Sequence, residues 1–406
     1  MTKSKVFGST LIIAGTTIGA GMLALPLASA GIGFTTSILL MAFLWALMAF
    51  TALLMLEIHQ YADHTATLHT LALQILGTKG KWLASFAMLF LFYSLCAAYI
   101  AGGGSQFADR IQQFAGANLS ASTATLIFTI IVALIVTIGT SAVDKVNRVL
   151  FISKIIAMVI VLSFLAPNVT QHYLLSMPTQ QGLIVAAIPV IFTSFGFHGS
   201  IPSVVNYLGG DTRSLRKVVI WGSAIPLIVY ILWQIVTLGV ISQSQLLQDS
   251  ALSSLIANLS HTVHSSQLAS IIGIFADLAL LTSFLGVSLG LFEYLGDILR
   301  KKLPQKSATS GRLIASLITF LPPLGFALFY PQGFIMALGY AAIALAILAI
   351  FLPIMMVHKV RQNEAACADK YRVFGGQVAL VGCGVAGIVI IGAQVLITFG
   401  VLPALG

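Results

Sequence analysis

Two charged residues lie where this sequence is otherwise almost purely apolar. Lys154 and Asp277 each fall within a run of apolar residues long enough to cross a membrane. A charge at bilayer depth costs upward of ~2.5 kcal/mol, so both are functional candidates, and either could exchange a proton. Lys154 could instead extend its ammonium to the nearby interface, and Asp277 could be a polar tie to a neighbouring helix. Glu57 and Glu293 lie at the ends of apolar runs, where we expect them to be solvated.

Two clusters of glycine and proline interrupt other apolar runs. The first is Gly15-Thr16-Thr17-Ile18-Gly19-Ala20-Gly21 with Pro26 after it, and the second is Phe195-Gly196-Phe197-His198-Gly199-Ser200-Ile201-Pro202. Glycine costs ~1 kcal/mol in a helix relative to alanine and proline ~3, so each cluster predicts unwound backbone at bilayer depth. Such backbone is tolerated only where it lines a cavity in the protein. The alternative is close helix packing through Gly15 and Gly19, which are four residues apart.

The composition of the chain is strongly apolar and poor in charged residues. Of the 406 residues, 58% are hydrophobic and 8% are charged, and the mean hydropathy is +1.02. A soluble chain carries about 25% charged residues, so most of this surface must face hydrocarbon. The sequence therefore predicts an integral membrane protein with lipid as its solvent, and it excludes water-soluble enzymes and nucleic-acid-binding proteins.

Apolar runs of at least ~18 residues predict eleven membrane-spanning helices. They cover approximately residues 6–29, 34–56, 82–108, 122–142, 149–166, 182–207, 218–240, 268–295, 313–330, 334–357 and 377–399.

The basic residues predict the orientation of these helices. With the N-terminus in the cytoplasm, 18 of the 20 Lys and Arg residues fall in cytoplasmic segments, as the positive-inside rule requires. Of the other two, Arg110 falls in a predicted outside loop and Lys154 within a helix. We therefore expect a periplasmic C-terminus, and the net charge of +9 marks the cytoplasmic face. Residues 3–30 resemble a secretory signal, but their apolar stretch exceeds the ~7–15 residues of a signal core, which favours an uncleaved first helix.

The sequence contains no motif for covalent catalysis or metal binding. Cys96, Cys367 and Cys383 lack metal-ligand spacing, and there is no phosphate-binding loop, nucleophile elbow or metalloprotease motif. A channel would show rings of charge or a repeated filter motif, and neither is visible. We expect no enzyme activity, no cofactor, no metal and no obligate protein partner.

The two glycine clusters occupy related positions in the chain. They fall in the first and sixth predicted helices, about 180 residues apart. If helices one to five are paired with helices six to ten, the first runs outward and the sixth inward, which is an inverted repeat. Paired interruptions in corresponding helices are the best sequence indication of a transporter binding site.

The same residues resemble a known family. Gly15–Pro26 is similar to the first-helix signature of the hydroxy and aromatic amino acid permease family, and Ile188–Ser200 is similar to its sixth helix. Ala276–Gly286 and Ala337–Ala341 also match, and the similarity covers essentially the whole chain. Within the family, the bacterial tyrosine-specific permeases are the nearest branch, and the tryptophan permeases share the glycine-rich first helix.

The resemblance implies an all-α polytopic membrane protein with a LeuT-like fold, in which helices one and six are discontinuous. Residues 1–178 would form the first inverted repeat, 179–358 the second, and 359–406 a cytoplasmic connection and an eleventh helix. It also implies proton-driven import of an aromatic amino acid, most directly L-tyrosine, across the bacterial inner membrane. Tryptophan or a broader aromatic range, and sodium instead of protons, are the alternatives; a channel is a distant one.

An amino-acid zwitterion needs one site for its carboxylate and another for its ammonium. Free N–H groups at the start of a half-helix bind anions, and carbonyls at the end of a half-helix suit an ammonium. The predicted substrate-binding residues are Gly19, Ala20, Gly21 and Met22 for the carboxylate, Ser194 and Phe195 for the ammonium, and Gly196, Phe197, His198 and Tyr99 nearby. Phe192 is a further candidate for stacking on an aromatic ring. A substrate phenol could bond to His198, Gln106 or Ser194, and the sequence does not choose among them.

The coupling residues follow from the resemblance. Sodium-coupled relatives of this fold bind the ion between helices one and eight, and Thr282 and Ser283 resemble the hydroxyl pair used there. Some proton-coupled relatives place a lysine ammonium at that position, which Lys154 matches. The predicted proton-coupling residues are therefore Lys154, Asp277, Thr282 and Ser283, and protons are favoured over sodium.

Overall fold

The chain folds into a bundle of membrane-spanning helices. The computed structural model describes residues 3–175, 183–248, 251–262, 266–302, 308–362 and 370–403. Within them, ten helices are long and apolar enough to cross a membrane, and an eleventh span forms from Ser4–Thr17 and Gly21–Ser29, which are bent by 52° at a short break. This agrees with the eleven predicted spans and defines a multi-pass membrane protein. The predicted repeat boundary at residues 178–179 and Cys367 lie outside the described residues.

The helices follow one another along the chain with short connections. The first half contains α1 (Lys3–Thr17), α2 (Gly21–Ser29), α3 (Gly33–His59), α4 (Leu68–Ala115), α5 (Ala121–Ile138), α6 (Thr140–Leu165) and the short α7 (Gln171–Leu175). The second half contains α8 (Leu183–Ser194), a 3-10 turn (His198–Ser200), α9 (Ile201–Tyr207), α10 (Thr212–Val240), α11 (Gln243–Gln248), α12 (Leu252–Thr262), α13 (Ser266–Lys302) and α14 (Ala308–Phe329). The last span but one is α15 (Phe334–Ala346), a π-helical segment (Ile347–Phe351) and α16 (Leu352–Arg361), and the last is α17 (Gly376–Thr398).

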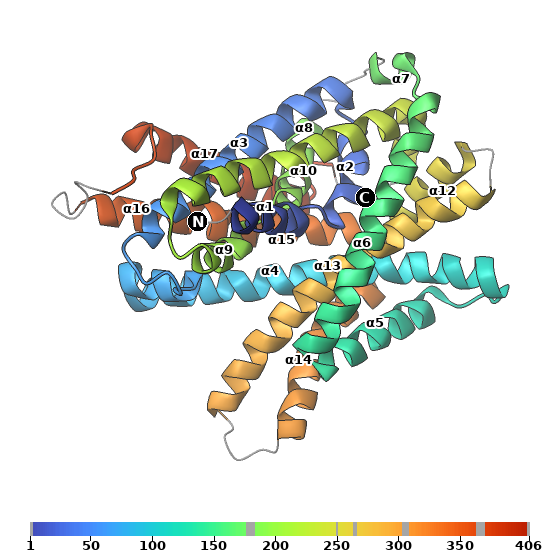
Figure 1. The fold of residues 1–406 in the computed structure, drawn as a ribbon. Helices are drawn as coiled ribbons and strands as arrows, with labels where there is room; N and C mark the ends of the chain where they lie inside the picture. Colours follow the sequence, from blue (N-terminus) through green and yellow to red (C-terminus); the bar gives the residue numbers. More distant parts are fainter. Residues whose placement is uncertain are drawn as a thin grey trace.

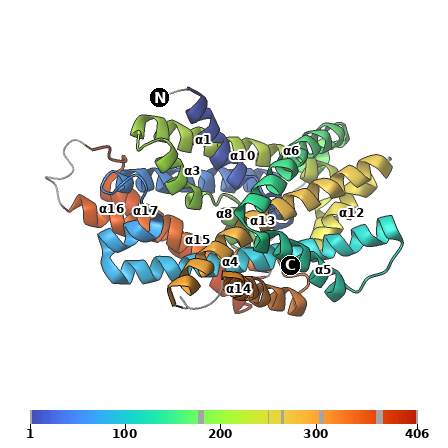
Figure 2. The ribbon, with the colours of Figure 1, turned by 60° about the horizontal axis from the view of Figure 1, so that its bottom comes forward.

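Several of the long helices run in similar directions. α3 and α10 pack against each other and run side by side in both views, and α4 runs in a similar direction (Figures 1 and 2). α6 crosses these helices steeply in Figure 1 and packs against α13. α7 and α12 lie at one end of the molecule, and α16 lies at the other (Figure 1).

α10 begins where the sequence supplies both a turn and a helix cap. Gly209 and Gly210 have φ angles of +56° and +75°, which residues with a side chain rarely adopt. Asp211 then accepts a hydrogen bond from the N–H of Arg213 at 3.3 Å. Hydrogen bonds from the Ser214 side chain and from the backbone hold the pKa of Asp211 below its usual value. A charged carboxylate therefore stabilises the positive end of the helix.

The third predicted helix is longer than the sequence indicates. α4 ends at Ala115 and contains Arg110, which was expected in a loop. Nε of Arg110 donates to Oδ2 of Asp277 in α13 at 2.7 Å. A Cβ on Gly273 would lie 1.1 Å from the Arg110 guanidinium, so glycine is what lets this side chain cross α13. Asp277 therefore ties α4 to α13, which is one of the two roles that the sequence left open for it.

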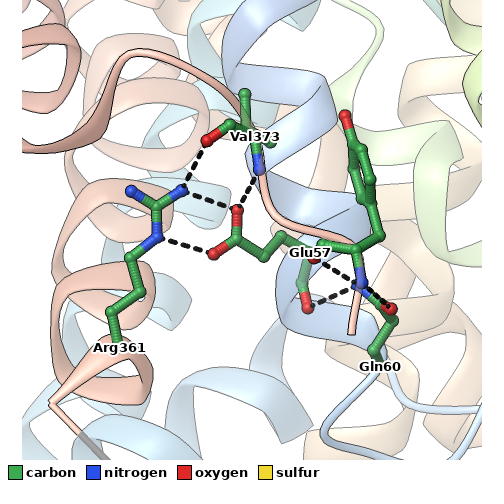
Figure 3. Close-up of polar contacts among 5 residues, drawn as sticks. Glu57, Gln60, Arg361 and Val373 are labelled. Atoms are coloured by element: carbon green, nitrogen blue, oxygen red, sulfur yellow. Dashed lines mark hydrogen bonds and ion pairs between the residues drawn. The ribbon is translucent and has the colours of Figure 1, made fainter. Parts of the chain in front are cut away.

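The expectation that Glu57 is solvated is wrong, because its side chain is buried at the end of α3 (2% exposed). Its two oxygens accept hydrogen bonds of 2.7 Å from Nε and Nη2 of Arg361, and one of 2.8 Å from the N–H of Val373 (Figure 3). The side-chain amide of Gln60 pairs with both the N–H and the C=O of Tyr371 (Figure 3). These bonds fasten the end of α3 to α16 and to the segment that leads into α17.

Breaking this buried ion pair should destabilise the protein more than breaking an exposed one. Glu57→Gln leaves the Arg361 guanidinium without its counter-charge in a buried site, which costs about 3–5 kcal/mol, so thermal unfolding in detergent should shift to a clearly lower temperature. The matched control is Asp144→Asn, which removes an exposed pair with Arg148 that contributes less than about 1 kcal/mol. Equal unfolding temperatures for the two variants would contradict this role of Glu57.

Candidate functional site

The first span is interrupted at the predicted glycine cluster. α1 ends at Thr17 and α2 begins at Gly21, so the last carbonyls of α1 lose their helical donors. Side chains from two other helices replace those donors. The hydroxyl of Tyr230 in α10 donates to the carbonyl of Thr17 at 2.6 Å, and the ammonium of Lys154 in α6 donates to the carbonyl of Ile18 at 2.9 Å. The carbonyl groups exposed by the break are therefore paired with specific side chains of other helices.

The N–H groups at the break are only partly paired. Ala20 donates to Oγ of Ser283 at 2.9 Å, and Met22 donates to the carbonyl of Gly19 at 3.2 Å. Among the described residues, the N–H groups of Gly19 and Gly21 have no acceptor. Of the four residues predicted to bind a carboxylate, these two therefore keep a free donor at the N-terminal end of α2, where an anion is stabilised.

Lys154 is buried at the break instead of reaching the interface. Its side chain is 2% exposed, and Nζ donates to the carbonyl of Ile18 and to Oγ1 of Thr282 at 3.2 Å. The ammonium also lies over the ring of Phe151, 4.7 Å from its centroid, which is within the range of a cation–π contact. The ammonium thus links α6 to α1 and α13.

The sixth span is interrupted at the second cluster and touches the first break. α8 ends at Ser194, and the next three residues are not helical. Oγ of Ser194 donates to the carbonyl of Gly21 at 3.0 Å, while the carbonyl of Ser194 accepts from Tyr230 at 2.9 Å. In the described part of the chain, the carbonyls of Phe195 and Gly196 have no donor. Unpaired acceptors in one break therefore lie beside unpaired donors in the other.

The remaining predicted residues divide between the break and its surroundings. Tyr99 is buried in α4, and its phenol lies near Ser283. His198 turns towards α3 instead, where its Nε2 lies 3.0 Å from Oγ1 of Thr51, and Phe197 packs on its ring with a centroid distance of 5.1 Å. The structure thus brings together, from the predicted set, Gly19, Ala20, Gly21, Met22, Tyr99, Lys154, Ser194, Phe195, Gly196, Thr282 and Ser283.

Tyr230, which no sequence pattern singled out, has a side chain that touches both breaks. It is fully buried in α10 (0% exposed), and Phe195 packs edge-on against its ring at 5.3 Å. A buried phenol needs a hydrogen-bond partner. A tyrosine in the middle of an apolar span was therefore the signal that could have marked this residue.

This geometry defines a class of protein. A multi-pass membrane protein with two facing interruptions, each presenting unpaired backbone groups, has the build of a transport protein. The chain belongs to the tryptophan/tyrosine permease family, which it matches over residues 2–394. This confirms the family resemblance and the absence of an enzyme class.

Named relatives cover the chain almost end to end. The chain is 44% identical to tyrosine-specific transport system 1 of Haemophilus influenzae, over 98% of this chain and 99% of that protein. It is 43% identical to tyrosine-specific transport system 2 of the same organism, over 99% of each. A tryptophan-specific transport protein of Haemophilus influenzae is 33% identical over 96% of each chain.

The glycines at the break should not tolerate a side chain. A Cβ on Gly19 would lie 2.6 Å from Oγ of Ser283, and one on Gly21 would lie 3.1 Å from Cα of Ser194. Gly19→Ala and Gly21→Leu should therefore reduce substrate uptake by about tenfold or more while the protein still reaches the membrane. The control is Gly8→Ala, because a Cβ at Gly8 meets nothing within 4 Å. Uptake by Gly19→Ala equal to that of Gly8→Ala would refute the close packing of the break.

Proposed function

We propose that this protein imports an aromatic amino acid, L-tyrosine first of all, by proton symport across the bacterial inner membrane. The observation that carries the proposal is the pair of facing breaks with unpaired donors on one side and unpaired acceptors on the other. Two relatives named for tyrosine transport are 44% and 43% identical, and a relative named for tryptophan transport is 33% identical. These values favour tyrosine, and tryptophan or a broader aromatic range is the second candidate.

The two breaks offer a zwitterion both of the partners that it needs. The carboxylate would accept hydrogen bonds from the N–H groups of Gly19 and Gly21, with the N-terminus of α2 behind them. The ammonium would donate to the carbonyls of Phe195 and Gly196, which have no donor among the described residues. The Oγ–carbonyl bond between Ser194 and Gly21 keeps the two sets of groups together. No charged side chain is required for either end of the substrate.

The aromatic ring of the substrate would lie against the side chains around the breaks. Phe192 and Phe197 are buried in or next to the sixth span, and Tyr99 approaches from α4. Gln106 follows on the same helix as Tyr99 and is 3% exposed, and its Nε2 has no partner among the described residues. Ser194 already donates its hydroxyl, and His198, whose Nδ1 is also unpaired, is bonded to α3 through its Nε2. We therefore favour Gln106 as the donor to a substrate phenol, with His198 as the second candidate.

Lys154 supports protons over sodium as the coupling ion. A sodium site at this position needs the carbonyl of Ile18 and the hydroxyl of Thr282 as oxygen ligands, and both already accept from the Lys154 ammonium. Because the Lys154 ammonium is part of the chain, it can release these two oxygens only if it loses a proton or if the side chain moves. We therefore assign coupling to Lys154 with Thr282 and Ser283, and assign to Asp277 the supporting tie to Arg110.

The proposed architecture is the LeuT-like fold with residues 1–178 and 179–358 as inverted repeats and residues 359–406 as the appended part. The interruption of both the first and the sixth span supports this pairing. The position of 18 of the 20 basic residues supports a cytoplasmic N-terminus and a periplasmic C-terminus.

Uptake by the purified protein in liposomes tests the proposed function. Labelled L-tyrosine should accumulate when the outside is acidic and should not respond to a sodium gradient at fixed pH. Unlabelled tyrosine should compete at least about tenfold better than phenylalanine, because a buried group left without the phenol is penalised. Accumulation driven by sodium would refute the coupling. Stronger competition by tryptophan than by tyrosine would transfer the substrate assignment to tryptophan.

A further inference from the structure

We propose that Tyr230 is a positioning residue that sets the spacing between the two breaks, so that one amino acid can be held at both of its charged ends. The inference rests on the proposed function for its ligand, a zwitterionic amino acid, but not on which side chain that amino acid carries. Tyr230 itself would not need to touch the substrate, because it acts on the backbone that does.

The phenol of Tyr230 joins backbone from two separate half-helices. Its hydroxyl lies 2.6 Å from the carbonyl oxygen of Thr17, the last residue of α1, and 2.9 Å from that of Ser194, the last residue of α8. Both carbonyls lie where a helix stops, so neither has its usual donor four residues on. A hydroxyl carries one proton, so the two carbonyls share it and are held at a fixed distance from each other.

The rest of α10 fixes the position of this phenol relative to the first span. Gly222 allows α10 to approach α1 closely, since a Cβ there would lie 2.8 Å from Cβ of Ile13. Further along, Nε2 of Gln234 donates to Oγ of Ser29 in α2 at 2.6 Å. Gly222, Tyr230 and Gln234 are spaced by eight and four residues and therefore lie on one face of the helix. That face contacts α1, the break and α2 in turn, so α10 packs against both halves of the broken span and holds them in place.

Fewer polar contacts join the first break and α10 to α8. Among the described residues, the polar link between the two breaks besides the Tyr230 hydroxyl is the bond from Oγ of Ser194 to the carbonyl of Gly21. Ser194 shares that hydroxyl with the carbonyl of Val190. Loss of the phenol oxygen would leave two buried carbonyls unpaired and remove the shorter of the two links. The free N–H groups of Gly19 and Gly21 would then no longer match the acceptors of α8, and substrate binding would weaken.

The test compares two tyrosines that make the same kind of bond. Tyr230→Phe removes the bridging hydroxyl, and Tyr93→Phe removes a hydroxyl that donates to the carbonyl of Ile318 at 2.9 Å between α4 and α14, away from the breaks. In liposomes, Tyr230→Phe should raise the KM for substrate about tenfold, the effect of one lost buried hydrogen bond, with Vmax per transporter within about twofold. Tyr93→Phe should leave KM unchanged. An unchanged KM for Tyr230→Phe, or equal shifts in both variants, overturns the proposal.

A second replacement separates the donor from the packing of the ring. Placing 4-aminophenylalanine at position 230 restores N–H donors at the para position and should return KM to within about twofold of the wild-type value. A KM as high as that of Tyr230→Phe overturns the proposal. If Tyr230→Phe yields no folded protein, the amino variant decides alone, with a wild-type KM in favour and a raised KM against.

Accumulation of substrate by the wild-type protein distinguishes a failure of this proposal from a failure of the proposed function. The substrate used is the aromatic amino acid that the wild-type protein accumulates. If the wild type accumulates none, the proposed function fails, whereas a wild type that transports together with a Tyr230→Phe variant of normal KM refutes only the role of Tyr230.

Discussion

The structure depends on one constraint, which is that backbone N–H and C=O groups at bilayer depth must find partners. The chain breaks its first and sixth spans and then supplies replacement partners from other helices. Lys154 and Tyr230 pair with the carbonyls at the end of α1, and Ser283 accepts from an N–H within the break. Among the described residues, the N–H groups of Gly19 and Gly21 and the carbonyls just after α8 are left unpaired. In the proposed function, selective pairing of this kind makes the two breaks a binding site.

The helices around the breaks carry different parts of this task. α10 holds the first span in place on both sides of its interruption, whereas α6 and α13 reach the break through side chains, among them Lys154 and Ser283. Two ion pairs lie away from the breaks and stabilise the packing of the surrounding helices. They are Glu57 with Arg361 at the end of α3, and Arg110 with Asp277 between α4 and α13. The buried cation at the break is bonded to oxygens of two other helices, so a change in its protonation would alter contacts among three helices at once.

The sequence predicted the number of spans, both interruptions and the family, because hydropathy and helix-breaking residues are local signals. It also placed Lys154 and Thr282 together, although only through resemblance to known folds. It could not predict that the Ala20 N–H is occupied, because that depends on how α13 packs against the break. The solvated position expected for Glu57 failed for a similar reason: its partner lies about 300 residues away in the chain. Tyr230 was missed because one polar atom on an apolar helix gives no periodic pattern, and its importance appears only when two distant carbonyls meet it.

The central step of the proposed mechanism is that the buried ammonium of Lys154 couples proton movement to transport. The direct measurement is proton entry during tyrosine entry into liposomes, recorded with an internal pH indicator, for Lys154→Gln and for Lys145→Gln, which alters an exposed lysine on the same helix. Lys154→Gln should still exchange tyrosine across the membrane but no longer carry protons with it, while Lys145→Gln should behave as the wild type. Proton entry with tyrosine that persists in Lys154→Gln would contradict this role of Lys154.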